Sequence, residues 1–475
     1  MEKSIQRNLA YNFAYQILAV LLPLITTPYV SRVLGPEKVG EYSYAYAVAY
    51  YFVMIAMLGL NNYGNRTIAS VRDQKEELSK EFCGIYLMQL LFGLLSLIAY
   101  GMYGLFFSNQ PMTWIVSLYV ISAIFDINWF FFGVESFKIT VIRNAIIKLA
   151  TTTLVFCFVK GQDDINKYAL IMVSGALSSQ LVLWKYIRGY VHLCKLTYTD
   201  VLKHIKPNLI LFIPVVAVSL YKVMDKIMLG AMTTKTEVGL YESSERIIQI
   251  PMALIQSIGT VMLPKMTNLI ANHDEKTSKN YISHSIMLVM LLSSSMSFGI
   301  MGVARYFVPI YYGEGYLKCV TLFQVLLPSC IFIAFANVIR TQFLIPKKRD
   351  KVYVISVVMG AIINLIVNYC LIPRFASVGA AVGTLIAEVV VCVYQALMVR
   401  KEIPIFEYVR KSVPFVVSGI IMYAVLAVVN IDASDVVNLF AHIIIGALIY
   451  VGLVWVWMIA IQKRRSSENP REVKM

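Results

Sequence analysis

Apolar runs of about 20 residues, joined by short polar connections, recur from one end of the 475-residue chain to the other. A run of this length is what an α-helix needs to cross the hydrocarbon core of a bilayer. Because the runs are continuous rather than alternating, they exclude a transmembrane β-barrel. The pattern predicts an all-α polytopic membrane protein with about 14 transmembrane helices. The helices are expected over residues 8–33, 40–62, 82–107, 112–132, 139–159, 166–188, 208–232, 239–263, 282–311, 318–345, 351–373, 377–399, 412–430 and 437–461.

The run from Val238 to Pro264 is long enough to span the bilayer, yet it carries two Glu, one Arg and two Gln residues. These residues are Glu242, Glu245, Arg246, Gln249 and Gln256. Their spacings of three, four and seven place them on one face of a helix. Since ionised side chains inside a membrane need a protein or water-filled surface beside them, this helix is predicted to line a hydrophilic cavity.

The composition agrees with a membrane protein, because 59% of the residues are hydrophobic, 15% are charged, and the mean hydropathy is +0.69. A soluble chain carries about 25% charged residues. The seven cysteines include no Cys-x-x-Cys pair and the five histidines are scattered, so we expect no metal site and no cofactor. The first apolar run is too long for a cleaved signal peptide, so we expect it to be retained as the first helix.

Lys and Arg residues are distributed unevenly between the two sides of the membrane. With the expected spans, 29 of the 42 fall on the side that carries both termini, and seven fall on the other side. Positively charged loops mark the cytoplasmic side. We therefore expect both termini in the cytoplasm and an even number of spans. The same bias accounts for most of the net charge of +15, which argues against a nucleic-acid partner.

A short motif occurs twice, about two hundred residues apart. Val39-Gly40-Glu41-Tyr42-Ser43 follows the first span, and Val238-Gly239-Leu240-Tyr241-Glu242-Ser243 follows the seventh. Six spans separate the two copies, so the copies have the same orientation, as in a parallel repeat about an axis along the membrane normal. The repeat predicts two six-helix lobes with an added pair of helices. The expected limits are 1–190 and 191–400 for the lobes, 401–462 for the added pair and 463–475 for a cytoplasmic tail.

Cationic side chains within the spans are the candidates for contact with a substrate. They are Arg246, Lys222, Lys226, Arg305, Arg143, Lys148 and Arg340. A positively charged cavity suits an anionic substrate, and arginine suits phosphate because its planar fork binds two oxygens at once. Each group has a plainer alternative: Lys222 and Lys226 could extend to the membrane surface, and Arg246 could pair with a nearby glutamate for structure alone. Arg143 and Arg340 could simply mark the inner boundary of the bilayer.

Acidic side chains within the spans could balance these charges or bind a coupling proton or sodium ion. They are Glu41, Asp225, Glu242, Glu245, Asp126 and Glu388. The sequence does not separate the two roles.

Three segments resemble signatures of the polysaccharide transporter family, the Wzx-type oligosaccharide flippases of the MOP superfamily. They are PYVSRVLGPEKVGEYSYAYA (28–47), DKIMLG (225–230) and VGLYESSERIIQIPMALIQSIGTVMLPKM (238–266). The resemblance implies two six-helix lobes in a V shape around a central cavity that works by alternating access. It also implies a substrate of undecaprenyl-diphosphate-linked oligosaccharide, moved from the inner to the outer leaflet of the bacterial cytoplasmic membrane. The polysaccharide polymerase and chain-length machinery are the partners that such a role implies.

The related lipid II flippases have an arginine in the eighth helix, before a proline and within a run that ends in Leu-Pro. Arg246, Pro251 and Leu263-Pro264 are similar, which implies a diphosphate-binding role for Arg246. Glu41 is similar to the acidic residue near the start of that family's second helix. The arginines of its first helix are not matched, because Arg32 lies near the outer end here. This departure favours a surface-glycan repeat unit, of O-antigen or capsule type, over a peptidoglycan precursor.

Two other functions are weighed against the flippase. A cation-coupled drug exporter of the same superfamily would need a net acidic cavity. Without Arg143 and Glu41, which lie near the ends of their spans, six cations stand beside five acids within the spans. A membrane polymerase or ligase of polysaccharide synthesis would need a large outward loop, and the expected connections are short. We therefore expect a transporter rather than an enzyme.

Overall fold

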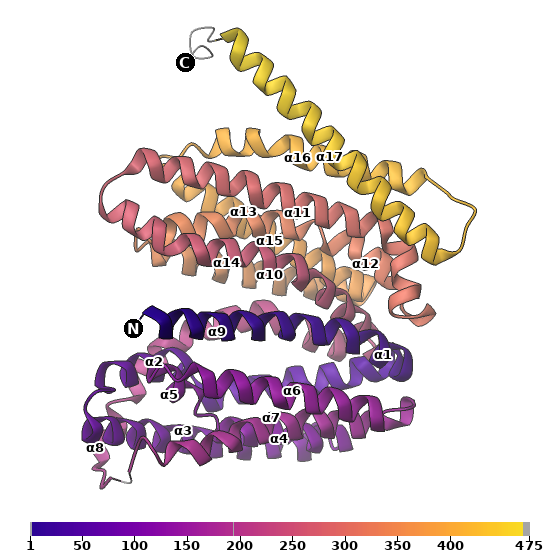
Figure 1. The fold of residues 1–475 in the computed structure, drawn as a ribbon. Helices are drawn as coiled ribbons and strands as arrows, with labels where there is room; N and C mark the ends of the chain where they lie inside the picture. Colours follow the sequence, from indigo (N-terminus) through magenta and orange to yellow (C-terminus); the bar gives the residue numbers. More distant parts are fainter. Residues whose placement is uncertain (1, 193, 469–475) are drawn as a thin grey trace. The chain divides into compact units, whose positions relative to one another are not determined.

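The computed structural model describes residues 2–192 and 194–468, and all regular structure in these ranges is helical (Figure 1). The α-helices are α1 (Glu2–Met57), α2 (Leu60–Val71), α3 (Lys75–Phe106), α4 (Pro111–Ile124), α5 (Asn128–Gly133), α6 (Phe137–Phe158), α7 (Ile165–Ile187), α8 (Tyr198–Leu202), α9 (Ile205–Met232), α10 (Lys235–Ala271), α11 (Glu275–Tyr311), α12 (Lys318–Leu326), α13 (Ser329–Ile339), α14 (Asp350–Phe375), α15 (Ser377–Val399), α16 (Ile405–Val428) and α17 (Asp435–Glu468). Two 3-10 turns, Gln162–Asp164 and Glu314–Tyr316, and one π-helical turn, Arg340–Leu344, complete the chain.

Thirteen helical segments of the described chain are long and apolar enough to cross a membrane. The first of them, Leu21–Val71, holds two of the expected spans, because α1 consists of two helices that meet at a kink at Gly35. Gly35 has a φ of 74°, a backbone conformation that glycine adopts without strain. The prediction of an all-α polytopic membrane protein with about 14 spans is confirmed.

The chain divides into two compact units, one up to Gly239 and one from Leu240 onward. In the first unit, α1 packs against α3, α4, α6 and α9. In the second unit, α11 packs against α13, α16 and α17, and α14 packs along α15. The division falls within the first two turns of α10, so α9 belongs with the first unit. The lobe limits that the repeat suggests, at residues 190, 400 and 462, stay a prediction.

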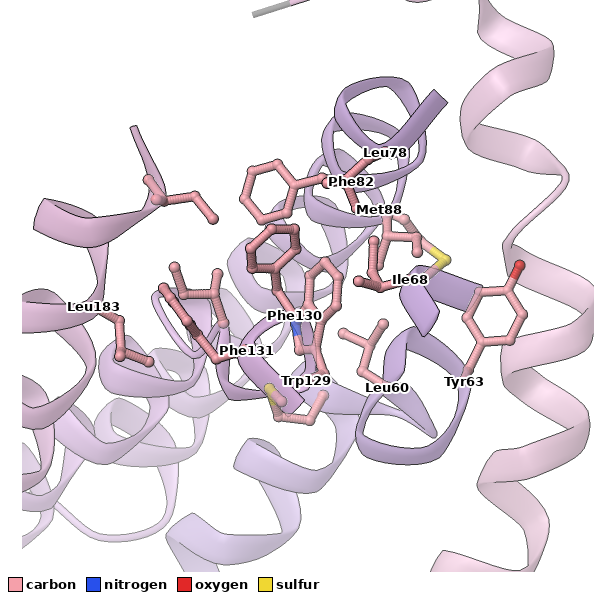
Figure 2. Close-up of a cluster of buried hydrophobic side chains, with 14 of the residues drawn as sticks. Leu60, Tyr63, Ile68, Leu78, Phe82, Met88, Trp129, Phe130, Phe131 and Leu183 are labelled. Carbon is pink, nitrogen blue, oxygen red and sulfur yellow. The ribbon is translucent and has the colours of Figure 1, made fainter. Parts of the chain in front are cut away.

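Aromatic side chains form much of the core of the first unit (Figure 2). Trp129, Phe130 and Phe131 of α5 are fully buried beside Phe82 of α3. The indole N–H of Trp129 donates to the Oε1 atom of Gln89 over 3.0 Å, so the polar atom of this large side chain is satisfied inside the core. This core fixes the end of α4 and the start of α5.

The glycines of the two copies of the repeated motif, Gly40 and Gly239, lie directly against each other within the first unit. A methyl group at Gly40 would lie 1.7 Å from the backbone oxygen of Lys235, and one at Gly239 would lie 1.9 Å from that of Pro36. Neither position has room for a side chain, because the backbones of α1 and α10 touch there. Small residues allow this close approach between membrane helices.

Candidate functional site

The polar stripe of α10 contains an ion pair in the second unit. The Nε atom of Arg246 donates to the Oε1 atom of Glu242 over 2.9 Å, one helical turn away. About a third of the Arg246 side chain (32%) is exposed, against 14% of Glu242. The guanidinium is therefore balanced by a carboxylate and still accessible from outside the protein.

Three neighbouring helices hold the opposite face of α10 in place. The Tyr312 hydroxyl at the end of α11 donates to the backbone oxygen of Ser243 over 2.7 Å. The Cys319 thiol of α12 donates to the backbone oxygen of Leu240 over 3.4 Å, and the hydroxyls of Tyr241 and Thr384 lie 2.8 Å apart. Because these contacts fix the rotation of α10 within the unit, they also fix the direction in which the Arg246 face points.

The inner part of the stripe continues on an accessible face. Gln249 and Gln256 are exposed, whereas Pro251 is buried. Pro251 cannot donate the backbone hydrogen bond that would close the preceding turn, which weakens α10 just after the ion pair. A polar face thus extends over four helical turns from Glu242.

Two other acidic side chains of the second unit differ in their burial. Glu245 is partly buried on α10, and Glu388 on α15 is only 7% exposed. Among the residues that the structure describes, Glu388 forms no hydrogen bond and no ion pair. A buried carboxyl in this setting is stable only when a proton or a cation neutralises it.

The remaining arginines of the second unit have separate partners. Arg340, in the π-helical turn after α13, donates from Nη2 to the Oδ1 atom of Asn337 over 2.5 Å and lies 5.6 Å from the ring centre of Tyr353. Arg305 of α11 is exposed, donates to the side chain of Asn430 and lies over the Tyr306 ring.

In the first unit, Arg143 is part of a buried network. Only 5% exposed, it donates from Nη1 to the backbone oxygen of Ser179 over 2.8 Å. Its Nη2 donates to the Oδ1 atoms of Asn128 and Asn144 over 2.9 and 2.7 Å. The Asn128 amide in turn donates to Asp126 over 2.7 Å. The network joins α5, α6 and α7.

The other predicted charges of the first unit are spread over three helices. Asp225 is buried on α9, and Lys226 and Lys148 are partly buried. The side chain of Lys222 lies outside the described residues. Glu41 pairs with Lys38 over 3.0 Å, shortly after the kink of α1 at Gly35. The roles assigned to these residues stay predictions.

Sequence reasoning missed Lys235, which was counted among the loop cations. Its Nζ atom lies 3.0 Å from the centre of the Tyr44 ring and donates to the backbone oxygen of Gly230 over 3.0 Å. The pair lines a pocket of about 210 Å³ whose other walls include Glu41, Tyr103 and Phe107. The sequence did offer one indication that these residues could be neighbours: Lys235 lies shortly before the second copy of the repeat, and Tyr44 lies directly after the first.

No group of three or more His, Cys, Asp or Glu side chains that could hold a metal ion occurs among the side chains that the structure describes.

The helical fold is similar to those of two solved membrane transporters. The lipid II flippase MurJ in an inward closed conformation matches with a TM-score of 0.76 at 14% identity, over 96% of this chain and 99% of that chain. A multidrug resistance MATE family transporter in an inward-facing conformation matches with a TM-score of 0.60 at 12% identity, over 82% and 96% of the two chains.

The chain belongs to the family described as polysaccharide biosynthesis protein, whose model matches residues 5–270, and it resembles the Wzx-type flippases. A protein of Escherichia coli named as an O-antigen transporter is 25% identical over 406 residues, which are 84% of this chain and 97% of that protein. A protein of Haloferax volcanii named as a low-salt glycan biosynthesis flippase is 27% identical over 233 residues, 48% and 49% of the two chains. The predicted family is confirmed.

Proposed function

We propose that this protein moves undecaprenyl-diphosphate-linked oligosaccharide repeat units from the inner to the outer leaflet of the bacterial cytoplasmic membrane by alternating access. The observation that carries the proposal is the ion pair of Arg246 with Glu242 on the accessible face of α10. An arginine that is partly exposed and held by one carboxylate can exchange that carboxylate for a diphosphate. The names of the relatives favour a glycan over an organic cation as the cargo.

The ion pair has a second role in this proposal, since it keeps the site neutral when no substrate is bound. An unpaired guanidinium within a membrane span is costly. Glu242 removes that cost, and its release on substrate binding leaves a carboxylate near the outer end of α10. The change of charge between the empty and loaded states gives the two states different stabilities, which alternating access requires.

The aromatic pocket of the first unit supports a glycan as the head of the substrate. The aromatic side chains of Tyr103 and Phe107 line this pocket, and so does the carboxylate side chain of Glu41. The C–H groups of a sugar ring carry a small positive charge that suits the negative face of an aromatic ring. The carboxylate can accept hydrogen bonds from sugar hydroxyls.

Glu388 is the group of the second unit that best suits a coupling ion. Its buried carboxyl has no ion pair or hydrogen bond among the described residues. A proton or a sodium ion would neutralise it, and loss of that ion would bring back the cost of a buried charge. Glu388→Gln is expected to abolish the dependence of transport on the ion gradient, measured in vesicles with and without imposed proton and sodium gradients.

The test of the proposed function is a strain whose surface polysaccharide depends on this gene. Arg246→Ala is expected to abolish surface polysaccharide and to cause lipid-linked repeat units to accumulate, whereas Arg246→Lys keeps part of the activity. Arg374→Ala, at an exposed position in the last turn of α14, is the matched control and is expected to leave production unchanged. Normal polysaccharide from Arg246→Ala at equal protein level would refute the proposal. Efflux of organic cations without any effect on polysaccharide would favour the drug-exporter alternative.

A further inference from the structure

A pocket of about 400 Å³ lies in the second unit, beside the C-terminal end of α10. The ion pair of Glu242 and Arg246 lies near the other end of the same helix. The connections that follow α10, the π-helical turn and α15 meet at this pocket. Its apolar wall includes Ile270, Phe343 and Ile403, and its polar wall includes Lys279, Lys347 and Lys348. Its volume lies in the range of pockets that bind small ligands.

Two residues of this pocket hold a backbone conformation that usually belongs to glycine. His273 has a φ of 58° and Lys348 a φ of 54°. Each ends a helical segment in the same way, because the next backbone N–H bonds five residues back, from Asp274 to Leu269 over 3.0 Å and from Arg349 to Leu344 over 2.8 Å. Glycine is the common residue at this position of a helix end. A basic side chain therefore stands at both positions at some cost to the backbone.

The residues that line the pocket include three lysines and one carboxylate, Glu275, so the lining carries a net positive charge. Lys347 lies 3.1 Å from Glu402, and Lys279 lies 3.3 Å from Glu275. Lys348 is exposed, and its ammonium group makes no hydrogen bond or ion pair among the described residues. The helices α11, α14 and α16 also begin at these connections, and the start of a helix carries partial positive charge.

We propose that this pocket binds the phosphate of an anionic phospholipid headgroup. The lysines would contact the phosphate, and the wall of Ile270, Phe343 and Ile403 would contact the first carbons of the lipid chains. Basic pockets between membrane helices on the cytoplasmic side are suited to such headgroups. The charge bias of the sequence assigns these same connections to the cytoplasm. The site is separate from Arg246 and does not depend on the identity of the cargo.

The test uses the full-length protein purified in detergent and titrated with phosphatidylglycerol, phosphatidylcholine or inorganic phosphate. Native mass spectrometry counts bound lipid, and thermal unfolding reports the stabilisation. Phosphatidylglycerol is expected to bind and to raise the unfolding midpoint, whereas phosphatidylcholine is not. Lys348→Gly is expected to weaken phosphatidylglycerol binding about fivefold, the factor for one lysine near an anionic surface.

The matched control is Ala376→Gly, because Ala376 also has a positive φ, of 50°, but does not line the pocket. Both glycine variants are expected to unfold at a slightly higher temperature without lipid, since both relieve the backbone. Only Lys348→Gly should lose affinity, and Lys348→Arg should keep it. Equal affinity of Lys348→Gly and Ala376→Gly for phosphatidylglycerol would overturn the proposal. Competition by inorganic phosphate at the same concentration as the lipid would overturn the assignment to a headgroup.

Discussion

Arg143 in the first unit and Arg246 in the second are both arginines of membrane helices, and their surroundings are opposite. Arg143 is 5% exposed and donates to three neutral oxygens from three residues. Arg246 is 32% exposed and pairs with Glu242 on its own helix. The first arrangement stabilises contacts between helices. The second is neutralised but accessible, which suits an arginine that exchanges partners with a ligand.

The largest expected effect on stability is that of Arg143→Ala. It leaves the oxygens of Ser179, Asn128 and Asn144 without this donor in a buried region, at a cost of about 3 kcal/mol or more. The thermal unfolding midpoint in detergent should fall steeply, together with the yield of folded protein. Arg143→Lys should recover only part of the loss, because an ammonium cannot reproduce the planar fork. An unchanged unfolding midpoint for Arg143→Ala would contradict a structural role for Arg143.

Asn128→Ala should have the next largest effect. Asn128 accepts from Arg143 and donates to Asp126 and, over 3.0 Å, to Gln180. Removing its amide breaks the hydrogen-bonded link between Arg143 and Asp126. This loss should lower the free energy of unfolding by about 1–3 kcal/mol. The double variant with Arg143→Ala should lose less than the sum of the two single variants, because both belong to one network. Fully additive midpoints would show that the network does not act as a unit.

Arg246→Ala should change stability by less than about 1 kcal/mol, because a partly exposed pair between neighbouring turns contributes little. Its effect should appear instead in transport and in affinity for a diphosphate. Isothermal titration with inorganic pyrophosphate should show weaker binding to Arg246→Ala than to the unmodified protein. Arg374→Ala is again the control. A fall in the unfolding midpoint as large as that of Arg143→Ala would show that Arg246 is structural as well.

Glu242→Gln should have the smallest effect on stability, below about 0.5 kcal/mol, since one ion pair within a helix is lost and the amide keeps the shape. Pyrophosphate should bind this variant more tightly, because the guanidinium no longer forms its ion pair with residue 242. Transport should slow nevertheless, as product release becomes harder. Weaker pyrophosphate binding would contradict the exchange of partners between Glu242 and the ligand.

Helical periodicity and hydropathy were sufficient to predict the spans, the all-helical class and the continuous polar face of α10. These properties depend only on the local sequence, since an α-helix places residues three, four and seven positions apart on the same face. The repeat could also be predicted from the sequence, because the same short motif follows both the first and the seventh expected span. The sequence did not predict that Gly40 and Gly239, one from each copy of the motif, lie in contact with each other.

The rotation of each helix against its neighbours was decided only by the tertiary structure. Arg143 could have been a boundary residue by its position, and packing buried it among Asn128, Asn144 and Ser179. Lys235 looked like an ordinary loop cation until the fold placed it over Tyr44. Periodicity orients the faces of one helix relative to each other, whereas the partner of each face depends on side-chain packing between segments far apart in the sequence.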